Sequence, residues 1–179
     1  MTLSVVWKIA NKKQDASAME AFKCAIKHPP KNRTFSWERE VEKYFHKEVW
    51  ADTNASSLLD QRFRVADDGD GIAAAYTHAR IADQPDFTPP AGEQTRLLVM
   101  LGIALRHRGK GGKFADEVLS DALYDILDSE PDSTTINVLA KVHMHNVPSQ
   151  KMLTRAEFQQ DTAGTPAKPL AWWSLTLER

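Results

Sequence analysis

Cysteine is nearly absent from this sequence: Cys24 is the one thiol among 179 residues, so no disulfide can form within the chain. Such a chain suits a reducing compartment. The run of about 18 to 20 apolar residues that a membrane-spanning helix needs is also missing. Residues 1–13 have neither a basic start nor a long apolar core, which argues against a signal peptide. We therefore expect a soluble cytoplasmic protein without a membrane partner.

The sequence also lacks an excess of either charge. The formal net charge is −1, with 23 Lys and Arg against 24 Asp and Glu, so the chain as a whole is not suited to bind a polyanion. Hydrophobic residues make up 42% and charged residues 26%, an ordinary globular composition. No repeat or low-complexity tract interrupts it. At 179 residues, the sequence predicts a single domain, 1–179, that buries most of its apolar surface.

Residues 96–127 combine three features that indicate a phosphate-binding turn. Residues 97–101 form an unbroken apolar run, which predicts a strand buried on both faces. Residues 106–112, RHRGKGG, form a basic loop with three glycines. Apolar residues then recur every three or four positions over 111–127, as on one face of a helix. Glycines let a ligand approach the backbone N–H groups of such a loop, and the start of a helix favours negative charge.

The remaining elements follow from apolar periodicity and from proline and glycine breaks. Strands are predicted at 3–9, 62–66, 72–81, 136–142, near Phe158 and at 170–177, and helices at 16–26, from the N-cap Ser36 to Val49, and at 148–156. Pro29 and Pro30 end the first helix. The charged residues of the second helix form its solvated face, and the proline-rich residues 82–95 predict a long loop. The expected order is β-α-α-β-β-β-α-β-α-β-β.

Two groups of residue types that bind metals are present, and neither predicts a metal site. Residues 67–71, DDGDG, resemble part of a calcium loop, but Ala79 stands where such a loop needs a glutamate. A hairpin turn that uses Asp-Gly accounts for them better. His143 and His145 are spaced as two metal ligands can be, yet no third ligand is evident.

The basic loop has the spacing Arg106-x-x-Gly109-x-Gly111, which fits the pattern R/Q-x-x-G-x-G/A. It does not fit the P-loop of NTPases, because no Ser or Thr follows its lysine. It does not fit the dinucleotide pattern G-x-G-x-x-G either, because Phe114 stands at the third glycine. The loop resembles the pyrophosphate loop of the GNAT superfamily of N-acetyltransferases.

A second segment, NVPSQKMLTRAEF, begins at Asn146 after a predicted strand. It is similar to the second GNAT signature, in which a strand is followed by Asn-x-x-Ala/Ser and by a helix that ends in Gly-Phe. Asn146, Ser149 and Phe158 stand at the matching offsets. Together the two motifs cover about residues 95–160 in register.

The resemblance implies an α/β (α+β) fold of the GNAT type, with a mixed, mostly antiparallel sheet of about seven strands and helices on both faces. It implies acetyl-CoA as cosubstrate, with the pantetheine arm in a gap where strands 97–101 and 136–142 splay apart. Motif spacing places this arm against residues 99–101, and a rival register uses residues 103–105. The backbone N–H groups of residues 107–112 would bind the pyrophosphate, and the side chains of Arg108 and Lys110 would add charge. The residues implied in cofactor binding are Val99, Met100, Leu101, Arg106, His107, Arg108, Gly109, Lys110, Gly111, Gly112, Asn146 and Ser149.

The chain departs from the family at the positions that usually carry acid–base chemistry. The tyrosine that protonates the leaving thiolate in many members is Leu153 here, and a glutamate that serves as base in some is Lys141. Glu157 replaces the glycine before the terminal phenylalanine. Imidazole titrates near neutral pH, so His143 and His145 are the candidate catalytic residues. Further carboxylates that could face the acceptor amine are Glu38, Glu40, Asp86 and Glu93.

Two functions compete. The first is an acetyl-CoA-dependent N-acetyltransferase that acts on a primary amine of a small molecule, protein or peptide, with the acceptor site built from the first two helices and the 82–95 loop. The second is a GNAT-fold module that binds CoA with little or no transferase activity on its own, which Leu153 favours. Nucleic-acid binding through the basic loop is disfavoured, because its basic residues are few and no aromatics lie between them. The identity of the acceptor, the length of the acyl group and a homodimeric state are left open.

Overall fold

A computed structural model of the chain describes residues 4–26, 36–51, 58–82, 91–109 and 111–179. Its elements follow the predicted order β-α-α-β-β-β-α-β-α-β-β. They are β1 (Val6–Ile9), α1 (Lys12–Ala21), α2 (Ser36–Lys43), β2 (Leu58–Asp67), β3 (Ile72–Ile81), β4 (Glu93–Ile103), α3 (Lys113–Asp128), β5 (Thr135–His143), α4 (Val147–Arg155), β6 (Gln159–Gln160) and β7 (Leu170–Glu178). A π-helical segment, Tyr44–Glu48, extends α2, and a short 3-10 turn, Leu105–His107, follows β4.

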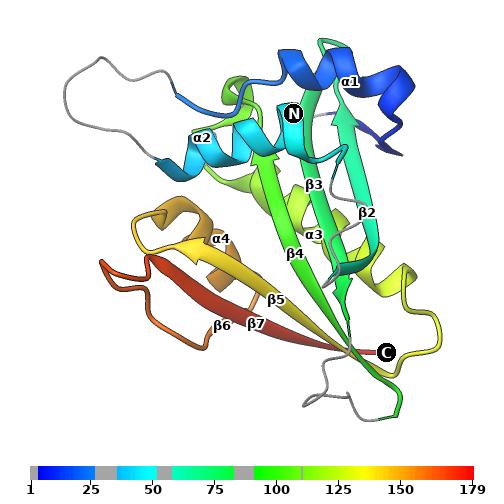
Figure 1. The fold of residues 1–179 in the computed structure, drawn as a ribbon, viewed down its shortest axis with the longest axis vertical. Helices are drawn as coiled ribbons and strands as arrows, with labels where there is room; N and C mark the ends of the chain where they lie inside the picture. Colours follow the sequence, from blue (N-terminus) through cyan, green and yellow to red (C-terminus); the bar gives the residue numbers. More distant parts are fainter. Residues whose placement is uncertain (1–3, 27–35, 52–57, 83–90, 110) are drawn as a thin grey trace.

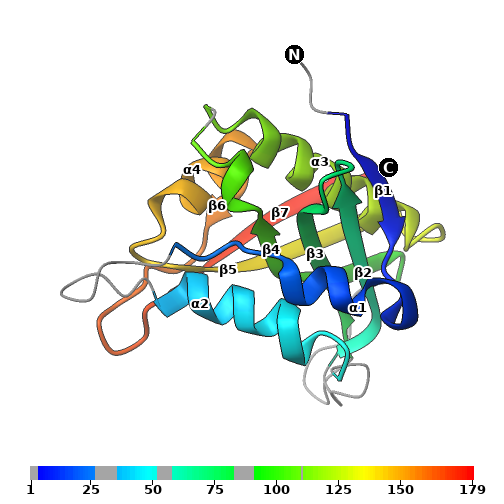
Figure 2. The ribbon, with the colours of Figure 1, turned by 90° about the horizontal axis from the view of Figure 1, so that it is seen from above.

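The strands of the described chain form one mixed sheet of seven strands in the order β1-β2-β3-β4-β5-β7-β6. β4 and β5 run parallel, and the other neighbouring strands are antiparallel. α1 and α2 cover one face of the sheet, and α3 and α4 cover the other (Figure 1, Figure 2). The predicted fold, a mostly antiparallel mixed sheet with helices on both faces, is confirmed.

The core consists of two apolar clusters. In one, Val118 and Ile126 of α3 pack with alternate residues of β5 such as Val138. In the other, Met19 of α1 and Phe45 of the π-helical segment pack on the sheet. Because successive side chains of a strand point to opposite faces, the alternating pattern of β5 directs one set of residues to α3 and α4.

The first helix lies nearer the N-terminus than predicted. It covers Lys12–Ala21 rather than 16–26, because the Asn11 side chain caps it by accepting a hydrogen bond from the Lys13 N–H (2.9 Å). Residues 22–26 are not helical, although Phe22 and Cys24 are buried. The predicted helix stop at Pro29 and Pro30 lies outside the described residues.

The charged face of α2 is not uniformly solvated, contrary to the prediction. The Glu42 carboxylate accepts hydrogen bonds from the N–H groups of Cys24 and Ala25, both at 2.9 Å, and Glu38 accepts one from the Ile26 N–H (3.1 Å). These glutamates provide the partners that a helix over residues 22–26 would otherwise have supplied. Segment 22–26 is therefore fastened to α2.

β2 and β4 are longer than predicted. β2 begins at Leu58 rather than at 62, and β4 covers Glu93–Ile103 rather than 97–101. Polar residues at the start of each strand interrupt the apolar pattern, whereas backbone pairing with neighbouring strands does not depend on side-chain type. Residues 93–95 of the predicted loop are thus strand, and residues 83–90 lie outside the described chain.

A buried polar network joins the sheet to α3. His78 is fully buried, its Nδ1 accepts a hydrogen bond from Arg96 Nη1, and its Nε2 donates one to Asp125 Oδ2, both at 2.8 Å. Arg96 also donates to Glu130 Oε1 (2.8 Å). Burial lowers the pKa of His78, so the ring is neutral at pH 7. Each charge in the network has a partner, as buried charges require.

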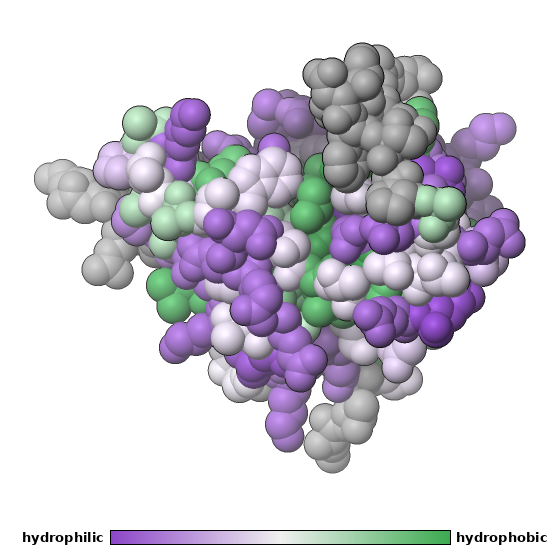
Figure 3. Space-filling model, turned by 90° about the horizontal axis from the view of Figure 1, so that it is seen from below, coloured by the Kyte–Doolittle hydropathy of each residue, from purple (hydrophilic) through white to green (hydrophobic). Residues whose placement is uncertain are grey.

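The molecular surface of the view in Figure 3 is mostly hydrophilic, and hydrophobic residues emerge on it as a narrow strip. None of the helices in the described part of the chain has the length and hydrophobicity to cross a bilayer. Across the same residues, no three His, Cys, Asp or Glu side chains gather as a metal site needs.

Candidate active site

The parallel strands β4 and β5 separate halfway along their length. They pair from their starts as far as Leu98 and Ala140. Beyond this point β5 continues with β7 to His143, and β4 continues with β3 to Ile103. Residues 99–103 of β4 consequently have no strand partner on the β5 side among the described residues. We refer to the V-shaped gap as the wedge; it is visible between the two ribbons in Figure 1.

A β-bulge marks the start of this separation. Thr77 of β3 pairs with Met100 and His78 pairs with Leu98, so Val99 is an extra residue in β4. A bulge bends the strand that contains it and increases its local twist. The bulge therefore provides a physical reason why β4 turns away from β5 here.

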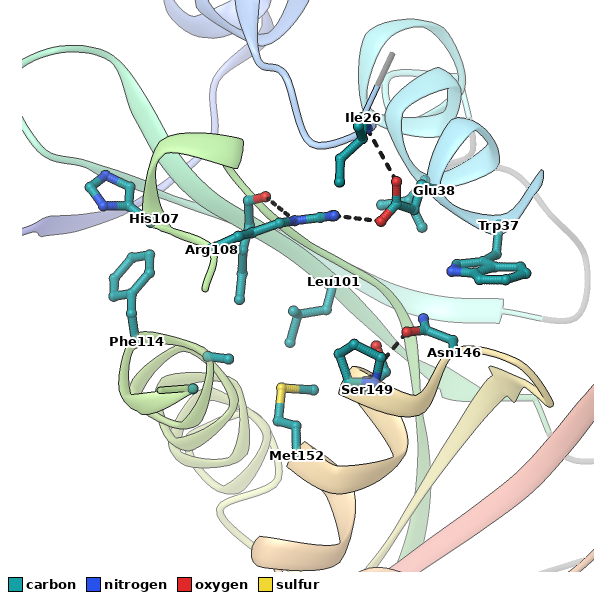
Figure 4. A pocket seen from close by; sticks show the side chains of 15 residues that line it. Ile26, Trp37, Glu38, Leu101, His107, Arg108, Phe114, Asn146, Ser149 and Met152 are labelled. Carbon is teal, nitrogen blue, oxygen red and sulfur yellow. Dashed lines mark hydrogen bonds and ion pairs between the residues drawn. The ribbon is translucent and has the colours of Figure 1, made fainter. Parts of the chain in front are cut away.

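Two adjoining pockets lie along the wedge. The first has a volume of about 390 Å³ and lies between α2, the glycine loop and the starts of α3 and α4 (Figure 4). The second, of about 270 Å³, lies between β4, β5 and α2. Both pockets are lined by Trp37, Val41, Leu101, Asn146, Ser149 and Met152. The shared lining makes them one continuous site that runs from the glycine loop to the apex of the wedge.

The strand residues expected at the pantetheine arm lie in this site. Val99, Met100 and Leu101 line the second pocket, and Leu101 also lines the first. In the rival register, Ile103 lines the first pocket and Leu105 lines neither. The strand is buried less completely than predicted, because the site opens one side of it: Leu98 is buried and the three residues after it are half-buried.

The glycine loop adopts a backbone that ordinary residues avoid. Gly109, Gly111 and Gly112 have φ values of 73°, 72° and 81°. Their N–H groups donate no hydrogen bond to any residue that the structure describes. Gly112 directly precedes α3, where the helix dipole adds partial positive charge. These glycine amides are therefore without a hydrogen-bond acceptor among the described residues, and Lys110 lies outside those residues.

Hydrogen bonds and an ion pair join the start of the loop to Asp68 in the β2–β3 turn. Arg106 Nη2 donates to Asp68 Oδ1 (2.9 Å), and His107 Nε2 lies 2.5 Å from Asp68 Oδ2. The Arg106 guanidinium, helped by His107, holds the pKa of Asp68 far below its ordinary value. The N–H groups of His107 and Arg108 donate to carbonyls within the 3-10 turn. Among the described residues of the predicted 107–112 set, the amides that donate no hydrogen bond are therefore those of the glycines.

Arg108 points across the first pocket to α2. Its Nη1 lies 2.5 Å from Glu38 Oε1, and its Nε donates to the Ile103 carbonyl (3.3 Å), as the dashed lines in Figure 4 show. The predicted cation of the loop is thus paired with a carboxylate. Arg106 is paired as well, with Asp68 of the β2–β3 turn.

Asn146 starts α4 as its N-cap. Its side-chain oxygen accepts a hydrogen bond from the Ser149 N–H (3.3 Å), and Pro148 occupies the first turn. Asn146 and Ser149 line both pockets. The capping interaction uses the oxygen of the amide and leaves its NH₂ group available to a ligand (Figure 4).

The two candidate histidines have different surroundings. His143 lines the second pocket and its ring is stacked on the indole of Trp37, with centroids 4.4 Å apart. His145 is exposed and lines neither pocket, but its backbone N–H donates to His143 Nδ1 (3.2 Å). Burial, reinforced by His145, lowers the pKa of His143, so its ring is neutral at pH 7. The hydrogen bond places the remaining proton on Nε2.

The departures from the GNAT pattern have identifiable surroundings. Leu153, at the position of the usual tyrosine, lines the second pocket and is 1% exposed. Lys141, at the position of the alternative base, has its ammonium over the Trp172 ring (4.3 Å). Glu157 has φ of 67°, a conformation that the usual glycine adopts without strain. The backbone shape of the motif is therefore kept without its usual residue.

The other carboxylates proposed to face the acceptor divide into three groups. Glu40 lines the second pocket, whereas Glu38 lines the first and is paired with Arg108. Glu93 lies at the start of β4, opposite Thr135, and lines neither of the two pockets. Asp86 lies outside the described residues.

Sequence analysis missed two residues of the site. Trp37 lines both pockets. The signal that could have identified it is its position four residues before Val41, which puts both residues on the same side of α2. Arg155 of α4 lies beside the glycine loop: a Cβ added to Gly112 would be 2.9 Å from its Nη2. Its placement depends on how α4 packs against α3, where it pairs with Asp116, and no local pattern contains that information.

No family model and no curated protein matches the sequence. Solved structures share its fold. One, from Desulfovibrio desulfuricans and assigned to the GNAT acetyltransferases, has a TM-score of 0.60 and 16% identity, with 98% of this chain and 99% of that chain covered. A chain of the NatC complex bound to Gag peptide and CoA has a TM-score of 0.57 and 9% identity, with 98% and 99% covered.

A toxin is similar in the same way. The structure of AtaT with acetyl-CoA and the C-terminus of the antitoxin AtaR has a TM-score of 0.61 and 10% identity, with 95% of this chain and 92% of that chain covered. At identities this low, the likeness concerns the fold.

Proposed function

We propose that this chain, which has the fold of the GNAT acetyltransferases, is an acetyl-CoA-dependent N-acetyltransferase that acetylates a primary amine. The observation that carries the proposal is the wedge between β4 and β5, which is continuous with a pocket beside open glycine amides. A long unbranched chain with a pyrophosphate at one end and a reactive carbonyl at the other fits this combination.

The residues present suit acetyl-CoA in three places. The N–H groups of Gly109, Gly111 and Gly112, beside the start of α3, would bind the pyrophosphate. The free edge of β4 after Leu98 offers backbone groups to the amides of pantetheine. Asn146 offers its NH₂ group between the two pockets. The proposed cofactor contacts are therefore mostly with backbone atoms. Such contacts do not depend on the side chains in which this chain departs from the GNAT pattern.

The reaction requires few side chains. The lone pair of a neutral amine attacks the thioester carbonyl, the C–N bond forms, and the C–S bond breaks. The nitrogen loses one proton and the departing thiolate gains one, so the products are an N-acetyl amine and free CoA. Holding both reactants in the wedge supplies most of the rate enhancement, because orientation replaces a chance encounter.

Among the described residues, His143 is well placed to exchange a proton, because it lines the pocket as a neutral ring. It can accept a proton at Nδ1 only after the hydrogen bond from the His145 N–H opens. Leu153 supplies no acid, so water or another group has to protonate the thiolate. We therefore expect a slow transferase, since a positioned acid or base usually contributes about 10²- to 10⁴-fold.

The test combines binding and turnover. The melting temperature is measured with and without acetyl-CoA; a micromolar Kd corresponds to about −8 kcal/mol of binding free energy. Ligand at about 100 times Kd should add about 2.7 kcal/mol to the free energy of unfolding. Release of free thiol is then followed with a panel of primary amines. Absence of any thermal shift at millimolar acetyl-CoA, in a folded sample, refutes the proposal.

A second function is favoured by Leu153 alone: a module that binds CoA without transferring the acyl group. It predicts the same thermal shift but no thiol release with any amine. The two measurements therefore separate the two functions.

A further inference from the structure

Glu40 is a carboxylate of the second pocket whose charge acts on Lys43, three positions later on α2, and on His143. It forms no hydrogen bond or ion pair with any residue that the structure describes. Glu38, two positions earlier on α2, is engaged by Arg108 and by the Ile26 N–H. Lys141 lines the same pocket, but its ammonium is occupied by the Trp172 ring. An exposed, unpaired carboxylate at the rim of the pocket is free to bind a cation.

Aromatic rings flank this carboxylate. Trp37 precedes Glu40 by three positions, so the two side chains leave the same side of α2. The Trp37 indole is stacked on the His143 ring at 4.4 Å with an interplanar angle of 26°, and all three residues line the second pocket. The face of a tryptophan ring attracts cations. Negative charge and an indole ring thus meet at one end of the site.

The group bound here as a cation is best kept separate from the amine that reacts. A carboxylate beside an ammonium group favours its protonated form, whereas attack on a thioester requires the neutral amine. Glu40 is exposed at the rim, while residues 99–101 along the wedge are half-buried. The rim therefore suits a second positive charge, held at a distance from the reacting nitrogen.

Apolar side chains occupy the space between these two ends. Val41 and Leu170 line the second pocket together with Leu98 and Leu101. A flexible hydrocarbon stem would be buried against them with a favourable change in free energy. These four side chains contribute no charge, and the ammonium of Lys141, which also lines the pocket, lies over the Trp172 ring.

On the basis of the transferase function proposed above, we infer that the acceptor carries two basic groups joined by an apolar stem. Glu40 and Trp37 bind one group as a cation, and the other group, a neutral primary amine, attacks the thioester. Glu40 is thus a specificity-determining residue, and diamines are the preferred class of acceptor.

The test compares three amines that share a four-carbon stem: butylamine, diaminobutane and aminobutyrate. Thiol release with saturating acetyl-CoA gives kcat/KM for each at one pH. The expected order is diaminobutane, then butylamine, then aminobutyrate. Glu40→Gln should raise KM for diaminobutane about fivefold and leave butylamine within about twofold, because a solvent-exposed ion pair contributes little more. Glu40→Lys should reverse the order of diaminobutane and aminobutyrate.

Matched variants separate specificity from general effects. Glu20→Gln removes the same charge from α1 outside both pockets and should change no KM. Trp37→Leu should weaken diaminobutane selectively, and Trp37→Phe should restore most of the preference because it keeps a ring. Equal kcat/KM for butylamine and diaminobutane in the wild type, or an unchanged ratio in Glu40→Gln, overturns the inference while leaving the transferase intact. Binding of acetyl-CoA without thiol release from any amine overturns both.

Discussion

Arg108 on the glycine loop and Glu38 on α2 form an ion pair across the first pocket, with Arg108 Nη1 2.5 Å from Glu38 Oε1. The side chains are 33% and 14% exposed, so the pair is partly shielded from water. A pyrophosphate in the pocket has to compete with Glu38 for this cation. The same carboxylate accepts a hydrogen bond from the Ile26 N–H, which links the loop to segment 22–26.

We expect Glu38→Gln to lower the Kd for acetyl-CoA about fivefold, because the released guanidinium becomes available to phosphate, and a partly exposed pair is worth about 1 kcal/mol or less. The glutamine oxygen can still accept from the Ile26 N–H, so the fold should persist. Isothermal titration measures the change. Glu42→Gln is the control, since Glu42 also accepts backbone hydrogen bonds but does not contact Arg108. Weaker binding in Glu38→Gln would contradict this reading.

Gly111→Val should abolish acetyl-CoA binding and leave a folded protein. Gly111 has φ of 72° and open space around its Cβ position, so the variant strains the backbone and places a side chain before the amides without a clash in the core. Gly69→Val is the matched control, because Gly69 has φ of 90°, equally open surroundings and a place at the tip of the β2–β3 turn. The melting temperature should fall by a similar amount in both variants. Titration with acetyl-CoA should show binding in Gly69→Val and none in Gly111→Val. Wild-type affinity in Gly111→Val would show that the loop is not the pyrophosphate site.

The two histidines should differ in their effect on the rate. His143→Ala should lower kcat about tenfold, below the range for a fully positioned base, because its Nδ1 is occupied in the resting geometry. It should also flatten the rise of kcat/KM with pH that a titrating imidazole produces. His145→Ala keeps the backbone N–H that orients His143, so it should stay within about twofold of wild type. Steady-state kinetics from pH 5 to 9 tests both, and an unchanged pH profile in the double variant would remove the histidines from the mechanism.

Leu153→Tyr should raise kcat about tenfold by supplying the missing acid for the thiolate. Leu153 is buried, so the larger ring should also cost about 1–3 kcal/mol of the free energy of unfolding. Leu153→Phe adds the same ring without the hydroxyl group and separates the two effects. If both variants have the same kcat, the hydroxyl has no role, and water or another group already protonates the thiolate.

The free energy of unfolding should fall as the pH is lowered from about 6.5, the ordinary pKa of histidine. Burial lowers the pKa of His78, so between this depressed value and 6.5 the unfolded chain binds a proton that the folded chain does not. Stability is therefore fully present above 6.5 and is lost as the pH falls through the folded pKa. Urea unfolding at a series of pH values measures the slope, and His78→Gln should make it shallower. His143, whose pKa is also lowered, is tested separately with His143→Gln.

The order of elements was predictable because it depends on local periodicity. α3 and α4 follow their apolar spacing, and the glycine loop lies between β4 and α3 as predicted. The bounds of α1 were not predictable in the same way. The apolar residues Phe22 and Cys24 suggested more helix, but residues 22–26 leave the helix to meet carboxylates on α2.

The site was predictable in its backbone and not in its ion pairs. Asp68 meets Arg106 and His107 from 38 and 39 residues away, and Glu38 meets Arg108 from 70 residues away. A single sequence shows that such charges exist but not which ones the topology brings together. For the same reason the loop cations were expected to be free for phosphate.

The pairing of β4 with β5 up to Leu98 and Ala140 gives the wedge a floor made of main-chain hydrogen bonds. A pantetheine arm that enters from the glycine loop can extend only as far as the Leu98–Ala140 pair. The register of β4 and β5 therefore limits how far its acyl end can reach. Side-chain truncation nearby can widen this end but cannot deepen it. An acyl group that is too long for this distance would have to bend toward Val142 or separate Leu98 from Ala140. The register of β4 and β5 is therefore a determinant of acyl-group length that lies in the sheet, in addition to the side chains that line the pocket.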